Sequence, residues 1–189
     1  ATYSVGVAYN NRKTSLQFIQ QEMNNITALS NETCQLGIQS RNMVLYIAKK
    51  DSPQPIRLMS SVGKQLPLYC TGLGRALLAY KSEEEIRSLF PEVLTAYTPH
   101  TIATINDLLK ELELTRQRGY AVEHEETNLM VNCIAVSLDY NNAPIAALSI
   151  SIPTFRISES KEKEAVQILW EAKQRIETHF KMYGVDFGN

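Results

Sequence analysis

The sequence predicts an α+β domain in which helices flank an antiparallel sheet. Two pairs of apolar segments are each joined by a short polar turn, and strands linked in this way pair antiparallel. Amphipathic helical patterns lie near both ends of the chain. With 189 residues, the chain is long enough for one domain with its own hydrophobic core.

The first half of the chain carries one helical pattern and three candidate strands. We expect a helix over residues 13–29, because its apolar residues recur every three or four positions. Strands are predicted over 34–38 and 43–48, with a turn at residues 40–42. Residues 51–55 contain two prolines and form a loop, and residues 56–62 are expected to form a third strand. The apolar positions of the helix are Leu16, Ile19, Met23 and Ile26.

Helix-capping residues mark the elements that follow. Ser82 and Glu85 form a capping box that opens a short helix. A second helix is predicted over 104–118, and Gly119 stands where a helix ends. A third, over 159–183, is capped by Ser158 and ended by Gly184.

The remaining strands include a hairpin. Residues 120–123 read as a single strand. Residues 133–140 and 144–152 read as a hairpin whose turn is Asn141-Asn142-Ala143.

Charge and composition exclude several classes of function. The net charge is -1, and no basic run or helix-turn-helix spacing occurs, so we expect no DNA-reading module in this chain. No apolar run approaches the ~20 residues of a membrane helix, and residues 1–5 do not resemble a signal peptide. The three cysteines are scattered without metal-ligand spacing, which favours a reducing, cytoplasmic location and argues against disulfides, metal or cofactor.

A glycine turn is the first candidate site. Gly72-Leu73-Gly74 opens a helical segment, where unsatisfied backbone N–H groups attract an anion such as a carboxylate. The alternative is a turn that only packs tightly. The segment lacks the Lys-Ser/Thr ending of a phosphate loop and the third glycine of a dinucleotide fingerprint.

Polar residues of the later strands offer further candidates. Ser149 and Ser151 share one strand face, where they could bind a polar ligand or face solvent. Cys133 with His124 suggests a thiol nucleophile, and the alternative is a buried structural cysteine. Glu123, Glu125 and Glu126 could serve acid–base chemistry, but we favour a solvated charge run because carboxylates are seldom buried without partners.

Two longer segments resemble one known family. Residues 66–79 read LPLYCTGLGRALLA, and a second block combines RGYAV at 118–122, CIAV at 133–136 and AALSIS at 146–151. Both resemble motifs of the IclR family of bacterial transcriptional regulators, in matching order and spacing over nearly the whole chain.

The resemblance implies a GAF-like or profilin-like fold, a curved antiparallel sheet flanked by helices. It implies that residues 13–184 are the effector-binding domain, that 1–12 are the remnant of a linker, and that the winged helix-turn-helix is absent from this chain. The resemblance further implies a small carboxylate effector, since several family members sense 2-oxo acids, sugar acids or aromatic acids. It also implies a homodimer or homotetramer, which is the common assembly in the family.

The resemblance also implies a set of ligand contacts. Backbone N–H groups of Gly72 and Leu73 would bind the carboxylate, and the polar end would meet Cys133, Ser149 and Ser151. Glu123 stands where the family often has Asp, and an apolar wall would come from Leu58, Leu66 and Val131. The chain departs from the family pattern at Met130, where relatives have Gly, and at Ser137, where they have Pro.

Three hypotheses for function follow. The first is an effector-binding and oligomerisation domain of a transcriptional regulator, without enzymatic activity. The second is a stand-alone thiol enzyme that uses Cys133 with Glu123 or His124. The third is a dimerisation module without a ligand.

Overall fold

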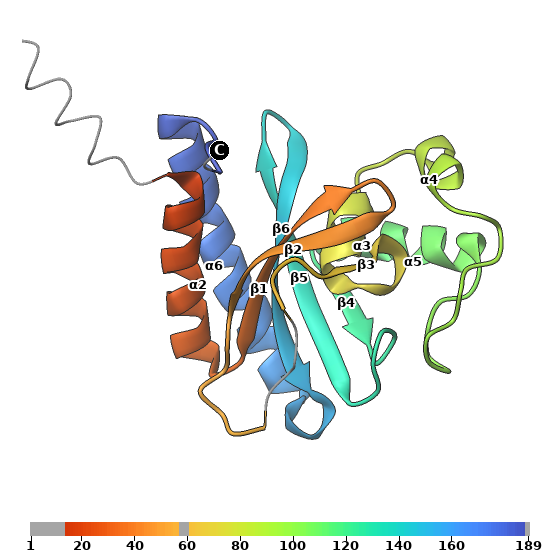
Figure 1. Ribbon diagram of the computed structural model, residues 1–189, viewed down its shortest axis with the longest axis horizontal. Coiled ribbons are helices and arrows are strands. Elements are labelled where there is room, and N and C mark those ends of the chain that lie inside the picture. The colour runs from red at the N-terminus through yellow and green to blue at the C-terminus, as the bar shows by residue number, and fades with distance from the viewer. Residues whose placement is uncertain (1–13, 57–60, 188–189) are drawn as a thin grey trace, which may run out of the picture.

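The computed structural model describes residues 14–56 and 61–187, which form a curled six-stranded sheet with helices on both faces (Figure 1). The strand order is β3-β2-β1-β6-β5-β4, and every neighbouring pair is antiparallel. The predicted α+β class is therefore confirmed. The strands are β1 (Thr33–Ser40), β2 (Met43–Lys50), β3 (Gln65–Pro67), β4 (Ala121–His124), β5 (Val131–Tyr140) and β6 (Ala143–Pro153).

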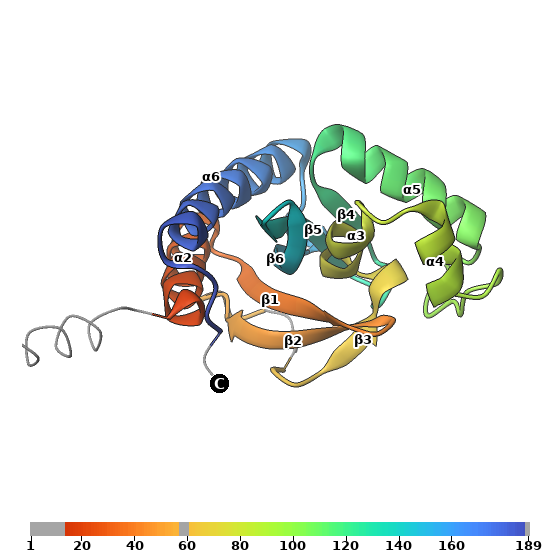
Figure 2. The same cartoon turned by 90° about the horizontal axis from the view of Figure 1, so that it is seen from above.

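The helices fall into two groups. The long helices α2 and α6 pack together on one face of the sheet, and the shorter α3 lies inside its curl, with α4 and α5 beyond it (Figure 2). No helix in the described part of the chain is long and apolar enough to cross a membrane. The helices are α2 (Ser15–Ser30), α3 (Gly72–Leu78), α4 (Glu83–Leu89), α5 (Ile105–Arg118) and α6 (Glu159–Tyr183), with 3-10 turns at Leu68–Cys70 and Thr154–Arg156.

Strand alternation divides the sheet residues between two cores. On β5, Ile134 and Val136 belong to the core under α2 and α6, whereas Ala135 belongs to the core around α3. On β6, Leu148 and Ala147 divide in the same way. Every second residue of these strands therefore faces α3, and these positions hold the candidate ligand contacts.

Local sequence signals account for the ends of the helices. Ser82 and Glu85 form the predicted capping box, since each side chain accepts a hydrogen bond from the other residue's backbone N–H. Ser158 caps α6 by accepting from the Lys161 N–H. Gly119 and Gly184 follow α5 and α6 with φ of 80° and 75°, a conformation that glycine adopts without steric cost.

The hairpin of β5 and β6 turns through two asparagines. Asn141 and Asn142 have φ of 52° and 62°, and Tyr140 pairs directly with Ala143. Two consecutive positive φ values suit a hairpin turn, and Asn tolerates them better than most residues. The predicted hairpin is confirmed, with a turn one residue shorter than expected.

The predicted strand over residues 56–62 needs correction. Residues 57–60 lie outside the described residues, and 56, 61 and 62 are not in a strand. Hydrogen bonding to β2 begins at the turn itself, where Gly63 has a φ of 87° and its N–H donates to the Tyr46 carbonyl oxygen at 2.8 Å. The strand that follows the turn is the short β3, which was not predicted from the sequence.

Candidate ligand-binding site

The start of α3 is held at the sheet by its cap. The Thr71 hydroxyl accepts from the Gly74 N–H at 3.0 Å and lies 3.2 Å from the Pro67 carbonyl oxygen, to which it donates. The N–H groups of Gly72 and Leu73 lie in the first turn, where a helix offers no acceptor of its own. The helix itself therefore supplies no partner for these two N–H groups.

Glycines allow this helix to approach the sheet closely. A Cβ on Gly72 would lie 3.3 Å from the Cys133 Cβ and 3.5 Å from the Ala135 Cβ, so α3 begins directly against β5. A Cβ on Gly37 of β1 would lie 3.1 Å from Leu73 Cδ1. The structure therefore brings Gly72, Leu73 and Cys133 together, as expected from the sequence.

A buried polar cluster lies on the same sheet face. The Ser151 hydroxyl lies 2.9 Å from Gln35 Oε1 and 3.1 Å from Cys133 Sγ, and the Ser149 hydroxyl lies 3.5 Å from the same Gln35 oxygen. Both serines are 1% exposed. The possibility that they face solvent is therefore wrong, and the prediction that they share a face is confirmed.

Glu123 borders this cluster from β4. It pairs with Cys133 across the strands, and its Oε1 accepts from the backbone N–H groups of Glu126 at 2.5 Å and Thr127 at 3.2 Å. Burial is the main cause that raises the pKa of the Glu123 carboxyl from 4.5 to about 7, and the two backbone N–H bonds oppose it. Glu123 is thus partly protonated near neutral pH.

The interpretation of residues 123, 125 and 126 as a solvated charge run is wrong for Glu123 and Glu126. They are 1% and 5% exposed. Glu126 forms an ion pair with the buried Arg75 of α3, whose guanidinium also donates to the Val122 and Tyr69 carbonyl oxygens at 2.8 and 3.0 Å. This network fixes α3 to the end of β4, and it explains how a carboxylate is buried here.

Sequence reasoning missed two residues of this region. Gln35 of β1 is 4% exposed and joins both serines, and Tyr46 of β2 is 7% exposed and has Glu123 and Cys133 as electrostatic neighbours. Burial raises the pKa of the Tyr46 phenol well above its ordinary value, so the phenol stays neutral. The available signal was a polar residue between apolar neighbours, as in Cys34-Gln35-Leu36.

The expected apolar wall is only partly described. Leu66 on β3 is partly buried and packs with the core around α3. Val131 begins β5 and shares the face of Cys133 by strand alternation. Leu58 lies outside the described residues.

The geometry does not support a thiol–imidazole pair. Burial, together with the Glu123 carboxylate, raises the pKa of the Cys133 thiol well above its ordinary value. His124 follows Glu123 on the strand and so points to the opposite face, where its Nδ1 lies 3.0 Å from Asn132 Oδ1. Within the described residues, no group of three His, Cys, Asp or Glu side chains could hold a metal ion.

Met130 adopts the backbone conformation that a glycine would favour. Its φ is 69°, and its N–H donates to Glu125 Oε1 at 2.7 Å while its carbonyl oxygen accepts from the Thr154 N–H at 2.9 Å. The side chain is 56% exposed. The departure from the family pattern therefore costs backbone strain but does not place a bulky side chain in the buried cluster.

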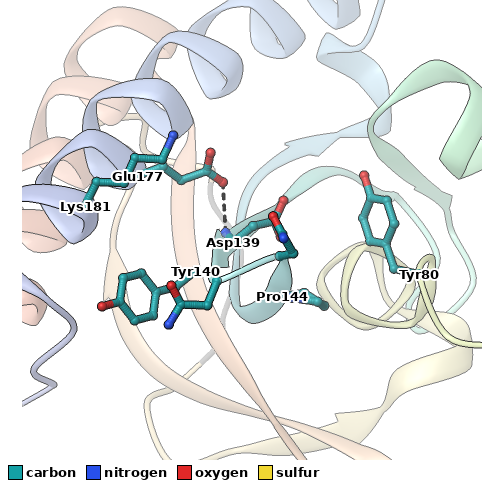
Figure 3. Close-up of a pocket in the computed structure, with 8 residues that line it drawn as sticks. Tyr80, Asp139, Tyr140, Pro144, Glu177 and Lys181 are labelled. Carbon is teal, nitrogen blue, oxygen red and sulfur yellow. Dashed lines mark hydrogen bonds between the residues drawn. The ribbon is translucent and has the colours of Figure 1, made fainter.

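A separate cavity of about 580 Å³ lies between the β5–β6 hairpin and α6 (Figure 3). There the Asp139 N–H donates to Glu177 Oε1 at 2.8 Å, as the dashed line in Figure 3 marks. Lys173, which does not line the cavity, lies 2.7 Å from Asp139 Oδ2 and 2.6 Å from Glu177 Oε1. The cavity contains none of the residues that the sequence predicted to bind ligand. Its lining is Tyr80, Asp139, Tyr140, Asn141, Asn142, Pro144, Glu177 and Lys181.

Comparison with known proteins identifies the family. A family model described as the C-terminal part of the bacterial transcriptional regulator IclR matches residues 9–178. The chain belongs to the IclR family. The transcriptional regulator KdgR of Dickeya chrysanthemi is 38% identical over 157 residues, 82% of this chain and 52% of KdgR. The transcriptional repressor AllR of Escherichia coli K12 is 32% identical over 178 residues, 93% of this chain and 66% of AllR.

A solved IclR-family structure agrees with the fold. The crystal structure of the C-terminal domain of E. coli KdgR has a TM-score of 0.78 and 32% identity, and covers 87% of this chain and 96% of that chain. The curled sheet is therefore the GAF-like fold of IclR C-terminal domains. The chain spans about half to two thirds of the length of the curated relatives named above.

Proposed function

We propose that this IclR-family chain is the effector-binding and oligomerisation domain of a cytoplasmic transcriptional regulator, and that its effector is a small organic acid. Residues 13–184 form that domain, residues 1–12 belong to a linker, and DNA is bound by a winged helix-turn-helix outside this chain. The active assembly is a homodimer or homotetramer, since a palindromic operator matches a symmetric protein. The effector acts by binding two states of the regulator with different affinity.

One observation supports this proposal: α3 begins directly against the part of β5 that carries the polar cluster. Gly72 lies against Cys133, and Ser151 lies 3.1 Å from that cysteine's sulfur. Burying hydroxyl and carboxyl groups costs free energy unless they are hydrogen-bonded, and such groups can also hydrogen-bond a polar ligand. The carboxylate of the ligand would bind at Gly72 and Leu73, and its other end would meet the cluster.

The remaining proposed contacts lie around the start of α3 and the polar cluster. Glu123 would border the polar end, and Leu66 and Val131 would supply apolar wall. Ser149 lies beside Ser151 on β6. The raised pKa of Cys133 disfavours the thiolate that a nucleophile needs, and this supports binding without catalysis.

A thermal-shift screen tests the proposal. The chain is heated with 2-oxo acids, sugar acids and aromatic acids, and an acid present at ~100 times its dissociation constant should add about 2.7 kcal/mol of stability. Ser149→Ala with Ser151→Ala should abolish the shift, whereas Ser88→Ala, at an exposed position of α4, should retain it. If no acid raises the melting temperature, the proposal is wrong.

A further inference from the structure

Helix α2 presents an exposed surface without charge. Within α2, all of which the structure describes, seven positions are exposed and none of them carries a charged side chain. The one charged residue of the helix, Glu22, is buried, and its Oε2 lies 2.9 Å from the Arg175 guanidinium of α6. The exposed positions are Gln17, Gln20, Gln21, Asn24, Asn25, Ala28 and Leu29.

Other helices of the domain expose charge in the ordinary way. α6 packs on the same face of the sheet as α2 and exposes Lys163, Glu164 and Glu171. α5 exposes Glu113 and Arg116. Charged side chains are usual on the solvent side of a helix, and they are depleted where two protein surfaces meet. In Figure 1 and Figure 2, α2 lies at the end of the molecule opposite α4, so its uncharged side is turned outward.

An apolar groove borders this surface where α2 begins and α6 ends. The Phe18 ring stacks on the His179 ring with centroids 4.3 Å apart, and the His179 ring lies 4.9 Å from that of Tyr183. Met182 is 66% exposed and Tyr183 is 52% exposed. Aromatic and methionine side chains are enriched in protein interfaces. The groove has a volume of about 350 Å³ and is lined by Phe18, Gln174, Arg175, Thr178, His179, Met182 and Tyr183.

We propose that the exposed positions of α2 and this groove, together the neutral face, bind a second copy of the chain with α2 against α2 about a twofold axis. This inference rests on the oligomerisation in the proposed function and assigns it to a surface. A twofold interface places each patch against the same patch of the partner, so a charged patch would meet its own charge. The neutral face avoids this repulsion. Because an amide both donates and accepts, its Gln and Asn side chains can hydrogen-bond to the same residues of a second copy.

The size of the neutral face predicts a reversible association. α2 has 16 residues and is therefore about 24 Å long. The face has seven positions on α2 and seven residues around the groove, whereas a stable interface of standard size has about 20–30 residues a side. We therefore expect an assembly that dissociates on dilution.

Analytical ultracentrifugation of the chain tests this assignment. The wild type should associate as its concentration rises from about 1 µM to about 1 mM, a range that covers weak interfaces. Gln20→Lys with Asn24→Lys puts positive charge on both copies of the face and should raise the dissociation constant about tenfold or more, because like charges then oppose each other. Asn106→Lys with Gln117→Lys adds the same charge at exposed positions of α5 and should keep the wild-type value. Circular dichroism checks that each variant is folded.

A charge exchange tests whether the neutral face meets its own copy. Gln20→Glu with Asn24→Glu should also associate weakly by itself. An equal mixture with the lysine variant should restore association, because opposite charges then meet across the twofold axis. A mixture that does not associate shows that α2 contacts a different surface and contradicts the proposal.

The results also separate this inference from the proposed function. A lysine variant that associates like the wild type overturns the neutral face as the interface but leaves oligomerisation standing. A wild type that stays monomeric up to about 1 mM removes both the inference and oligomerisation by this chain. Effector binding is tested separately by the thermal-shift screen, and the lysine variant should respond to the same acids as the wild type.

Discussion

Replacing Glu123 by Gln should change how the stability of the domain depends on pH. The carboxyl is 1% exposed, and burial raises its pKa from 4.5 to about 7 in the folded chain. The folded state therefore holds the proton over a range in which the unfolded state has lost it. The free energy of unfolding falls as pH rises from 4.5 towards 7, because ionising the buried group opposes folding.

The size of this effect follows from the two pKa values. A rise in the Glu123 pKa from 4.5 to about 7 lowers the free energy of unfolding by about 3 kcal/mol between pH 4.5 and pH 8. The amide introduced by Glu123→Gln would keep an oxygen for the N–H groups of Glu126 and Thr127 but would carry no proton to lose. Between pH 4.5 and pH 8, the free energy of unfolding of the variant should therefore rise by about 3 kcal/mol relative to that of the wild type.

Urea unfolding at pH 4.5 and pH 8 measures the difference. Glu84→Gln removes the same charge at an exposed position of α4 and serves as the control. A stability difference between Glu123→Gln and wild type that stays constant with pH, or that moves in the opposite direction, would show that the folded chain does not raise the pKa of Glu123.

Three further predictions concern stability and are checked by chemical unfolding. Gly74→Ala should lower stability by more than about 3 kcal/mol because its Cβ would lie 2.2 Å from the Leu68 carbonyl oxygen. Gly72→Ala, whose nearest contact would be 3.3 Å, should lower stability by about 1 kcal/mol, and equal losses in the two variants would contradict this. Met130→Gly should stabilise by up to about 1 kcal/mol because it relieves a φ of 69°, and a loss would show that the side chain contributes more than the strain costs. Glu126→Ala should cost about 3–5 kcal/mol because it leaves Arg75 buried without its carboxylate partner, and a loss below about 1 kcal/mol would show that the pair is dispensable.

Most of the fold was predictable because local signals set it. The capping box at Ser82, the glycine stop at Gly119 and the turn at Asn141-Asn142 each fix a boundary through backbone geometry. The strand after Gly63 was missed because it has three residues and holds its place by pairing with β2, which no local pattern reveals. Sequence periodicity needs longer segments than this.

The candidate site was predictable only in part. Alternation placed Ser149 and Ser151 on one face, but it could not show that α3 covers that face. The burial of Glu126 depends on Arg75, which is 51 positions away in the sequence. Gln35 was missed for the same reason, since its serine partners are 114 and 116 positions away. Partners of this kind become visible only when the sheet is assembled.

We propose above that the acid binds between the start of α3 and the buried polar cluster. The most direct measurement is the change in backbone amide NMR signals of the ¹⁵N-labelled chain during titration with an acid that stabilises it. We expect the largest shifts at the N–H groups of Gly72 and Leu73, with little change at Gly63 or Gly184. Shifts concentrated instead around Asn141 and Lys181 would place the ligand in the cavity beside α6 and rule out binding at the start of α3.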